Sequence, residues 1–212
     1  PMAWDVRRLV AGLPPTIRSS IGHIASRYGS KAQKTLVRDV YARYPWYATK
    51  SELKDLLPPT MPALPSASLA VYTVGYERIS VDAFFDRLLH AGIRGIADVR
   101  ANPISRKYGF AKTSLSGIAT KLGLAYRHLP QLGIPSEERS ALGGFSSYQT
   151  LLDRYESEML PAQSTGVAEL SRIVERESTA LLCVEADVRC CHRSRLAKAV
   201  ARETGLTIVH LT

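Results

Sequence analysis

The stretch "TALLCVEADVRCCHRSRLAKAVARETG" (179–205) decides the fold of this chain. Its first part, "TALLCVEA", is an apolar run with the length of a strand. Its last part, "CHRSRLAKAVARETG", places Leu196, Ala197 and Val200 on one face of a helix. Another apolar run, "LTIVHL" (206–211), follows directly. A strand, a helix and a second strand in this order predict two parallel strands joined by a helical crossover.

The same alternation extends upstream. Strands are predicted in "ASLAVYTVGY" (67–76), "IRGIADVR" (93–100) and "LAYRHLP" (124–130). Helices are predicted between the strands, at 80–92, 112–123, 146–160 and 166–178. We therefore predict an α/β fold, with a Rossmann-like, mostly parallel five-stranded sheet between helices and a small all-helical module before it.

A proline-rich segment, "LLPPTMPALPSAS" (56–68), separates the two parts. We predict a basic helical module at 1–57, a linker at 58–68 and the α/β domain at 69–212. Within the module, apolar spacing predicts helices at 16–29, 30–45 and 49–57. Three short helices with tight turns are typical of a helix-turn-helix-like arrangement, and also of small bundles with other roles.

The composition restricts the class of protein. The chain has 212 residues and a hydrophobic fraction of 45%, which is enough for a sizeable core. No apolar run has the length of a membrane span, about 18 residues. The three cysteines, Cys183, Cys190 and Cys191, are an odd number within nine residues, which argues against a disulfide framework. We expect free thiols in a reducing, cytoplasmic setting.

The charge of the chain suggests a polyanionic partner. Residues 1–60 hold ten Lys or Arg and four Asp or Glu, so they carry +6 of the net charge of +9. This imbalance favours a nucleic acid, DNA more than RNA, or a phosphate-bearing ligand, although a solvated basic surface has the same composition. The predicted nucleic-acid-binding residues are Arg18, Arg27, Lys31, Lys34, Arg38, Arg106 and Lys107.

Polar residues follow each predicted strand of the α/β domain. Because the carboxyl ends of parallel strands meet at one edge, we expect these residues to form one site there. The candidate catalytic residues are Asp98, Glu185, Cys191 and His128. The candidate ligand- or phosphate-binding residues are Gly75, Tyr76, Arg100, His192 and Arg193.

Several chemistries remain open at this edge. One is a thiolate nucleophile, Cys191 or Cys190, whose pKa the start of the following helix would lower. Another is a carboxylate and arginine site, in which Glu185 or Asp98 does acid/base work while Arg100 and Arg193 clamp a phosphate. Asp98 could instead cap the strand end or form a salt bridge to Arg100. A third is a divalent metal site from Cys183, Glu185, Cys191 and His192. No residue is assigned to it, because adjacent Cys and His side chains rarely chelate one ion and the chain has no CxxC. In the simplest case, the thiols pack as small apolar groups.

Three segments carry a family resemblance. They are "TVGYERISVDAFFDRLLHAGIRGIADVRANPISR" (73–106), "LAYRHLPQLGI" (124–134) and "LLCVEADVRCCHRSRLAKAV" (181–200). Residues from about 70 to 212 resemble the bacterial domain-of-unknown-function family 488. Its members share a T-[IV]-G-[HY] strand, a D-V-R strand with a nearby proline, an H-L-P-x-L-G segment and a C-x-E-x-D-x-x-x-C-H-R junction. By position, the resemblance implies that the shared polar and turn residues are Gly75, Asp98, Arg100, Pro103, His128, Leu129, Gly133, Cys183, Glu185, Cys191, His192 and Arg193.

This resemblance implies the α/β fold and selects Cys191 over Cys190 as the motif thiol, but it implies no reaction. Three hypotheses for the function follow. The first is an enzyme, a hydrolase or transferase, that acts on a nucleic acid or nucleotide. The second is a non-enzymatic DNA-binding regulator with a ligand-sensing α/β domain. The third is a thiol redox or metal sensor that uses Cys183 and Cys191.

Overall fold

The structure is a computed structural model that describes residues 6–43, 51–52, 55, 65–140 and 145–212. It divides the chain into two units, residues 1–62 and 63–212. The boundary falls inside the segment 58–68, most of which lies outside the described residues, as does most of the helix predicted at 49–57. Each unit is described here by itself.

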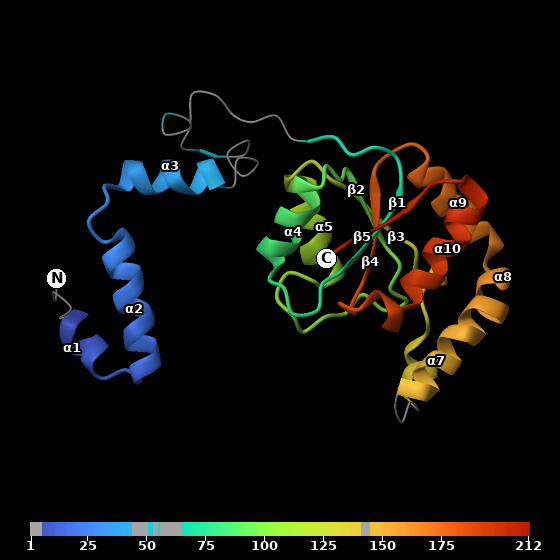
Figure 1. The fold of residues 1–212 in the computed structure, drawn as a ribbon, viewed down its shortest axis with the longest axis horizontal. Helices are drawn as coiled ribbons and strands as arrows, with labels where there is room; N and C mark the ends of the chain where they lie inside the picture. Colours follow the sequence, from blue (N-terminus) through green and yellow to red (C-terminus); the bar gives the residue numbers. More distant parts are fainter. Residues whose placement is uncertain (1–5, 44–50, 53–54, 56–64, 141–144) are drawn as a thin grey trace. The chain divides into compact units, whose positions relative to one another are not determined.

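The N-terminal unit contains three helices, α1 (Val6–Ala11), α2 (Pro15–Tyr28) and α3 (Gln33–Arg43) (Figure 1). The helices predicted at 16–29 and 30–45 are thereby confirmed. Helix α2 begins at a proline, which is favourable there because the first helical N–H has no partner within the helix. No residue of α2 is buried, and Ile17 and Ile24 are 47% and 57% exposed. The described residues of this unit therefore provide helices, but no packed core around α2.

The second unit is built on a five-stranded sheet. Its strands are β1 (Val71–Gly75), β2 (Gly95–Asp98), β3 (Ala125–His128), β4 (Thr179–Cys183) and β5 (Ile208–Leu211). The order is β3-β2-β4-β1-β5, and all pairs are parallel. Strands β1, β2 and β4 are buried along their whole length, which is why they read as continuous apolar runs. The predicted α/β class and the five strands are confirmed.

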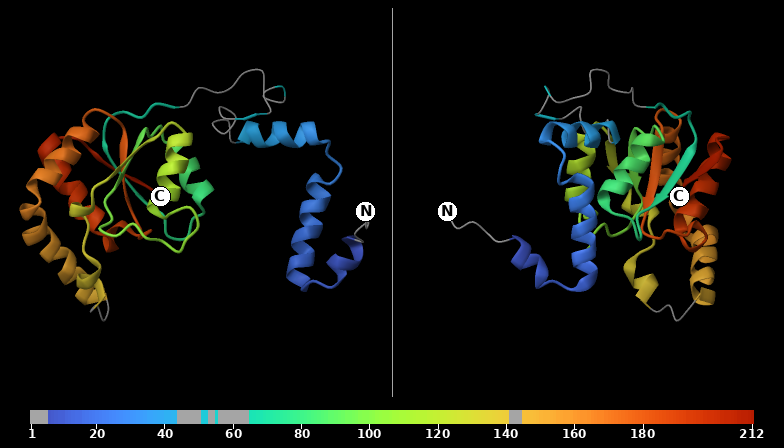
Figure 2. Two further views of the ribbon diagram at one scale, coloured as in Figure 1. Left: turned by 180° about the vertical axis from the view of Figure 1, so that it is seen from behind. Right: turned by 60° about the vertical axis from the view of Figure 1, so that its left-hand side comes forward.

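Helices cover both faces of the sheet (Figures 1 and 2). One face carries α4 (Val81–His90) and α5 (Lys112–Lys121). The opposite face carries α7 (Phe145–Arg154), α8 (Leu160–Ala162), α9 (Ser164–Val174) and α10 (His192–Thr204). The short elements of this unit are the helix α6 (Ser136–Ser140), the 3₁₀ turns η3 (Pro130–Leu132) and η5 (Val188–Cys190), and the π-turn η4 (Tyr155–Met159).

Local sequence explains where several elements begin and end. The Ser80 side chain accepts a hydrogen bond from the backbone N–H of Ala83 and so caps α4. Gly205 follows α10 with a φ of 73°, the left-handed conformation that commonly ends a helix. The helix predicted at 146–160 is interrupted by η4. The buried Tyr155 of this turn donates a hydrogen bond to the carbonyl oxygen of Leu132 at 2.6 Å.

The connections reverse direction between β1 and β4. From β1 the chain crosses through α4 toward β2 and β3, whereas from β4 it crosses through α10 on the opposite face toward β5. The loops that leave β1 and β4 therefore part to opposite faces of the sheet. Ligands of open parallel sheets bind at such a switch point, outside the carboxyl ends of the strands.

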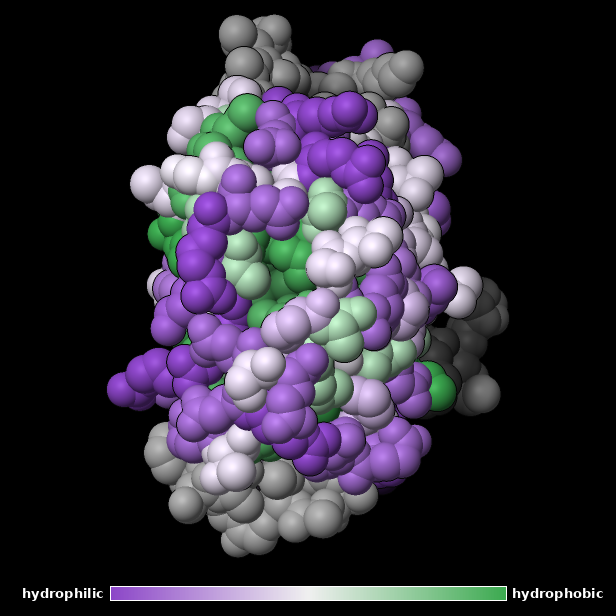
Figure 3. Space-filling model, turned by 90° about the vertical axis from the view of Figure 1, so that its right-hand side faces the viewer, coloured by the Kyte–Doolittle hydropathy of each residue, from purple (hydrophilic) through white to green (hydrophobic). Residues whose placement is uncertain are grey.

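The helical face opposite α4 and α5 is mostly hydrophilic. Figure 3 looks onto it and shows hydrophilic side chains around a smaller hydrophobic area. A hollow of about 460 Å³ lies here, with apolar lining from α8, α9 and α10 that includes Leu160, Val167 and Ala199. Its lining residues all come from the outer helices and none from the carboxyl edge of the sheet. In the part of the chain that the structure describes, no helix has both the length and the apolar character needed to cross a bilayer.

Candidate functional site

Strand register brings the motif residues of four strands into two adjacent rows at the carboxyl edge. Gly75 at the end of β1 is paired with Cys183 at the end of β4. Asp98 at the end of β2 is paired with Leu182 on one side and with His128 of β3 on the other. Gly75 and Cys183 therefore form one row at the carboxyl edge, whereas Asp98 and His128 form the row before it, whose member on β4 is Leu182. Because successive residues of a strand point to opposite faces, Cys183 and Asp98 lie on different faces of the sheet.

Asp98 and Arg100 form a buried ion pair at this edge. Arg100 donates from Nε to Oδ1 of Asp98 at 2.7 Å and from Nη2 to Oδ2 at 2.5 Å. The two residues are 0% and 3% exposed. Burial disfavours the charged guanidinium, but the hydrogen bond and the negative charge of Asp98 outweigh it and raise the pKa of Arg100.

Further hydrogen bonds complete this pair. Tyr126 donates its hydroxyl to Oδ2 of Asp98 at 2.6 Å, and burial together with this bond raises the pKa of the tyrosine. Arg100 donates from Nη1 to the hydroxyl of Tyr76 and to the carbonyl oxygen of Phe110. The sequence left two roles open for Asp98, proton transfer or a salt bridge to Arg100, and the structure has the salt bridge. Arg100, which we expected to clamp a phosphate, faces Asp98, so the pair connects β2 with β3 and with the loop that holds Phe110.

His128 and Tyr76 also make contacts inside the protein. The Nε2 of His128 lies 2.9 Å from the carbonyl oxygen of Arg100, and its Nδ1 lies 3.1 Å from Nζ of Lys112. Tyr76 is 5% exposed and stacks on Phe110 with ring centroids 4.2 Å apart. Phe110 thus covers the ring face that Tyr76, a candidate ligand-binding residue, would offer to a ligand.

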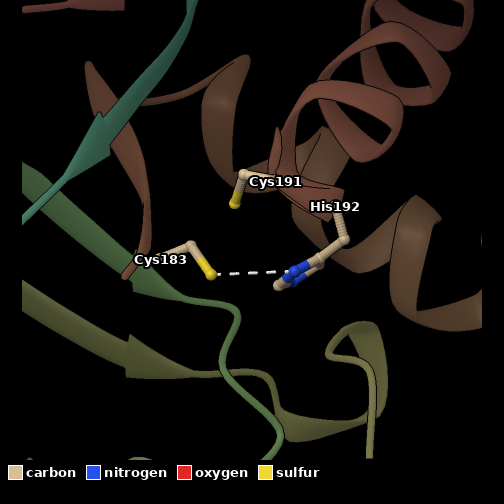
Figure 4. A group of neighbouring side chains, drawn as sticks. All are labelled: Cys183, Cys191 and His192. Atoms are coloured by element: carbon tan, nitrogen blue, oxygen red, sulfur yellow. Dashed lines mark hydrogen bonds between the residues drawn. The ribbon is translucent and has the colours of Figure 1, made fainter. Parts of the chain in front are cut away.

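The remaining candidates gather at the switch point. Cys183 ends β4, and Cys191 and His192 begin α10. The ligand atoms of these three side chains all lie within 4.8 Å of one another, and their side chains point into one space (Figure 4). Glu185 joins them, because its Oε2 accepts a hydrogen bond from the thiol of Cys183 at 3.2 Å. Two thiols, an imidazole and a carboxylate are thereby brought together.

The local backbone explains how adjacent residues reach the same space. Cys191 is the N-cap of α10 and has extended dihedrals, φ −139° and ψ 134°, whereas His192 is already helical. The change of conformation between them turns both side chains toward Cys183 (Figure 4). An adjacent Cys and His rarely bind one ion together, but here both side chains face the same space. The objection to a shared ion therefore does not apply to Cys191 and His192. Cys183, Cys191 and His192 are the residues that could hold a metal.

The expected activation of Cys191 is wrong. We expected the start of α10 to lower the pKa of this thiol. Burial, followed by the neighbouring thiol of Cys183, instead raises it well above the ordinary value, although His192 opposes the shift. The thiol is 0% exposed, so its thiolate would be cut off from water. This cost is larger than the stabilisation that the start of the helix gives the thiolate. Cys191 in this form is a neutral thiol and not an activated nucleophile.

Glu185 is the ionised member of the cluster. Burial alone would raise its pKa, but hydrogen bonds from Cys191, from its own backbone and from Cys183, together with the charge of His192, outweigh burial and lower it. Tyr148 of α7 donates its hydroxyl to the other carboxylate oxygen at 3.2 Å. The carboxylate is half-buried, so it lies between the buried thiols and the surface.

Arg193 holds the loop that carries Glu185. It donates from Nη1 to the carbonyl oxygen of Glu185 at 2.5 Å and from Nη2 to that of Ala186 at 3.2 Å. Its Nε is buried and has no hydrogen-bond partner among the described residues. Gly75 makes this arrangement possible, because a Cβ there would lie 2.0 Å from the carbonyl oxygen of Glu185.

The predicted nucleic-acid-binding residues are mostly exposed, and they fall in both units. The five on α2, on α3 and between them are exposed: Arg18, Arg27, Lys31, Lys34 and Arg38. Lys31 forms an ion pair with Asp39. In the second unit, Arg106 is exposed, and the half-buried Lys107 donates to the carbonyl oxygen of Tyr76 at 2.8 Å.

Sequence reasoning missed three tyrosines of the site: Tyr126, Tyr148 and Tyr155. The ring of Tyr155 meets that of His192 edge to face at 5.3 Å. Tyr126 lies two residues before His128, and the period of two in a strand could have placed both on one side. Tyr148 and Tyr155 lie on the helical segment before β4, and their sequence carries no signal for contact with the cluster.

A known family model matches the part of the chain that contains the cluster and the ion pair. The family model "Domain of unknown function DUF488" matches residues 80–200, more than half of the chain. The chain belongs to this family. The DUF488 match includes Asp98, Arg100, His128 and the whole of the Cys183–His192 cluster, and it leaves the N-terminal unit outside. No curated protein and no solved structure matches the chain.

Proposed function

We propose that this DUF488 protein is an enzyme that acts on a nucleic acid or a nucleotide at the carboxyl edge of its sheet. The observation that carries the proposal is the position of the Cys183, Glu185, Cys191 and His192 cluster. It lies at the switch point of a parallel sheet, where such folds bind ligands. An ionised carboxylate beside buried thiols and an imidazole is a chemically versatile set, and a domain that only packed its core would not need it.

Glu185 is the residue to which we assign proton transfer. Its pKa is lowered, so it is ionised at neutral pH and can accept a proton. It is half-buried, whereas Cys183 and Cys191 are 0% exposed. In this proposal the ion pair of Asp98 and Arg100 positions β2, β3 and the loop that holds Phe110, because both charged groups bind to other groups of the protein.

Charge supports the choice of substrate. The net charge is +9, and exposed cations lie on α2 and α3 as well as on the loop after β2. Lys107 of that loop reaches the backbone of Tyr76 directly after β1, which brings positive charge to the switch point. Phosphate groups are attracted by such a surface in a way that depends strongly on salt.

The test uses the full chain with single- and double-stranded DNA and RNA oligonucleotides and with free nucleotides. We expect binding that weakens with rising salt, and product formation that Glu185→Gln lowers by about 10²–10⁴-fold without loss of binding. Glu169→Gln is the matched control, because this exposed acid lies on α9, outside the shared motifs and outside the cluster. Its turnover should remain that of the natural protein.

Three results would overturn the proposal. The first is no salt-dependent binding to any of these molecules. The second is binding without turnover by the natural sequence, which favours the regulator hypothesis. The third is turnover that Glu185→Gln leaves unchanged.

A further inference from the structure

We infer that Cys183, Cys191 and His192 form the binding site for one thiophilic divalent cation of the Zn²⁺ class. The inference does not depend on the substrate proposed above, because it concerns what these three side chains hold and not what the protein acts on. It begins with their separation. Tetrahedral zinc with Zn–S of about 2.3 Å and Zn–N of about 2.0 Å places neighbouring ligand atoms roughly 3.5–3.8 Å apart. The Sγ of Cys183 lies 3.6 Å from Nδ1 of His192, and all three ligand atoms lie within 4.8 Å of one another.

The orientation of His192 points to the same conclusion. Its Nε2 lies 3.0 Å from the carbonyl oxygen of Val99, and a carbonyl only accepts, so Nε2 carries the proton. In the neutral ring, Nδ1 then presents its lone pair toward the thiols. An imidazole fixed by a backbone carbonyl on the far nitrogen is the usual outer contact of a metal-binding histidine. The edge-to-face contact with Tyr155 holds the ring plane in addition.

Packing alone does not account for the three side chains. Cys183 and Cys191 are 0% exposed and His192 is 4% exposed. Alanine or valine would fill such space without burying an imidazole whose Nδ1 faces the thiol of Cys183. Two sulfurs and one imidazole nitrogen favour zinc over magnesium or calcium, because the latter two prefer oxygen ligands.

The carboxylate of Glu185 lies beside the three proposed ligands. Three protein ligands with one open position are typical of catalytic zinc, whereas structural zinc has four. The carboxylate of Glu185 lies on the outer side of the cluster, 3.2 Å from the thiol of Cys183, and Tyr148 orients it from the other side. It can therefore bind a water at the fourth position or replace it. A cation in such a site lowers the pKa of a bound water to about 7.

The experiment uses Co²⁺ and Zn²⁺ with the full-length protein and no substrate. We expect about one equivalent of Co²⁺ to bind, with the thiolate-to-metal charge-transfer band and the intense visible bands of tetrahedral cobalt. Zn²⁺ should displace it. Elemental analysis of protein purified without chelator should also find close to one equivalent of zinc.

Variants assign the ligands. We expect Cys183→Ser, Cys191→Ser and His192→Gln each to weaken Zn²⁺ binding at least 100-fold in a chelator competition. The matched control is Cys190→Ser, because this half-buried thiol lies next to the cluster but outside the ligand set. Its affinity and its cobalt spectrum should equal those of the natural sequence. Circular dichroism shows whether each variant is folded. If a variant does not fold, the cobalt spectrum of the natural sequence still tests the metal site.

A cobalt complex without thiolate bands, less than a tenth of an equivalent bound, or equal losses in Cys190→Ser and Cys191→Ser would each refute the metal site. The outcome is independent of the proposed function. A protein that binds the ion but neither binds nor converts nucleic acids and nucleotides keeps the metal site and loses the function. A protein that binds no metal but converts nucleic acids or nucleotides keeps the proposed function and loses the metal site.

Discussion

The ion pair of Asp98 and Arg100 allows a quantitative prediction. The carboxylate of Asp98 is 0% exposed and accepts four hydrogen bonds, from the backbone N–H, Nε and Nη2 of Arg100 and from Tyr126. Arg100→Met removes the two side-chain bonds and the neutralising charge, and leaves a buried carboxylate without its cation. Breaking a buried pair from one side costs about 3–5 kcal/mol. For a chain of this size, that loss corresponds to a fall in Tm of roughly 6–20 °C.

A double-mutant cycle tests the origin of this loss. Asp98→Asn should destabilise the fold by a similar amount, because it leaves the guanidinium of Arg100 unpaired. The double variant should be more stable than the sum of the two losses predicts, by about 2–3 kcal/mol, since no unpaired charge remains. The free energy of unfolding is measured by urea denaturation followed by circular dichroism, with the m-value expected to stay constant.

Additive losses, or a loss below about 1 kcal/mol for Arg100→Met, would contradict this account of the pair. An Asp98→Asn variant of unchanged stability that has lost all turnover would give Asp98 a chemical role instead. The cycle therefore separates a positioning pair from a catalytic acid.

Two further predictions concern the edges of the site. Gly75→Ala should lower Zn²⁺ affinity at least 10-fold and the free energy of unfolding by about 1–3 kcal/mol, because its Cβ would lie 2.0 Å from the carbonyl oxygen of Glu185. The control is Gly117→Ala, whose Cβ would have nothing within 4 Å. It should be neutral or stabilising in the same urea and metal titrations. His210 should titrate below 6.5 by NMR, because burial and the positive charge of Arg193 lower its pKa. Its contribution to stability is therefore present above pH 6.5 and is lost as the pH falls, and a midpoint above 6.5 would refute this.

Much of the fold could be read from the chain because local patterns govern it. The continuous apolar runs at β1, β2 and β4 reflect burial on both faces, and Ser80 marks the start of α4 in the ordinary way. The π-turn η4 could not be read, because its buried Tyr155 bonds to Leu132, a partner on another element.

The sequence predicted that the polar residues after the strands lie at one edge, but it did not predict which of them face one another. Parallel strands place their carboxyl ends together, so the polar residues after each strand had to meet at one edge. The partner of Arg100 could not be derived, because two were possible. Its guanidinium could pair with the carboxylate of Asp98 two residues away, or it could bind a ligand in an open site. The pKa of Cys191 was assigned the wrong direction for a related reason. The helix start is visible in the sequence, whereas the depth of burial that outweighs it is not.

The amino-acid sequence by itself determined the α/β alternation, the family and the edge at which the polar motifs collect, since periodicity and residue order are local properties of the chain. The tertiary structure alone decided which of those residues face one another. The strand order placed β4 between β1 and β2, and the N-cap of α10 turned Cys191 and His192 together toward Cys183. Contacts of this kind depend on elements far apart in the chain and on a single change of backbone conformation, which no spacing of residues reveals.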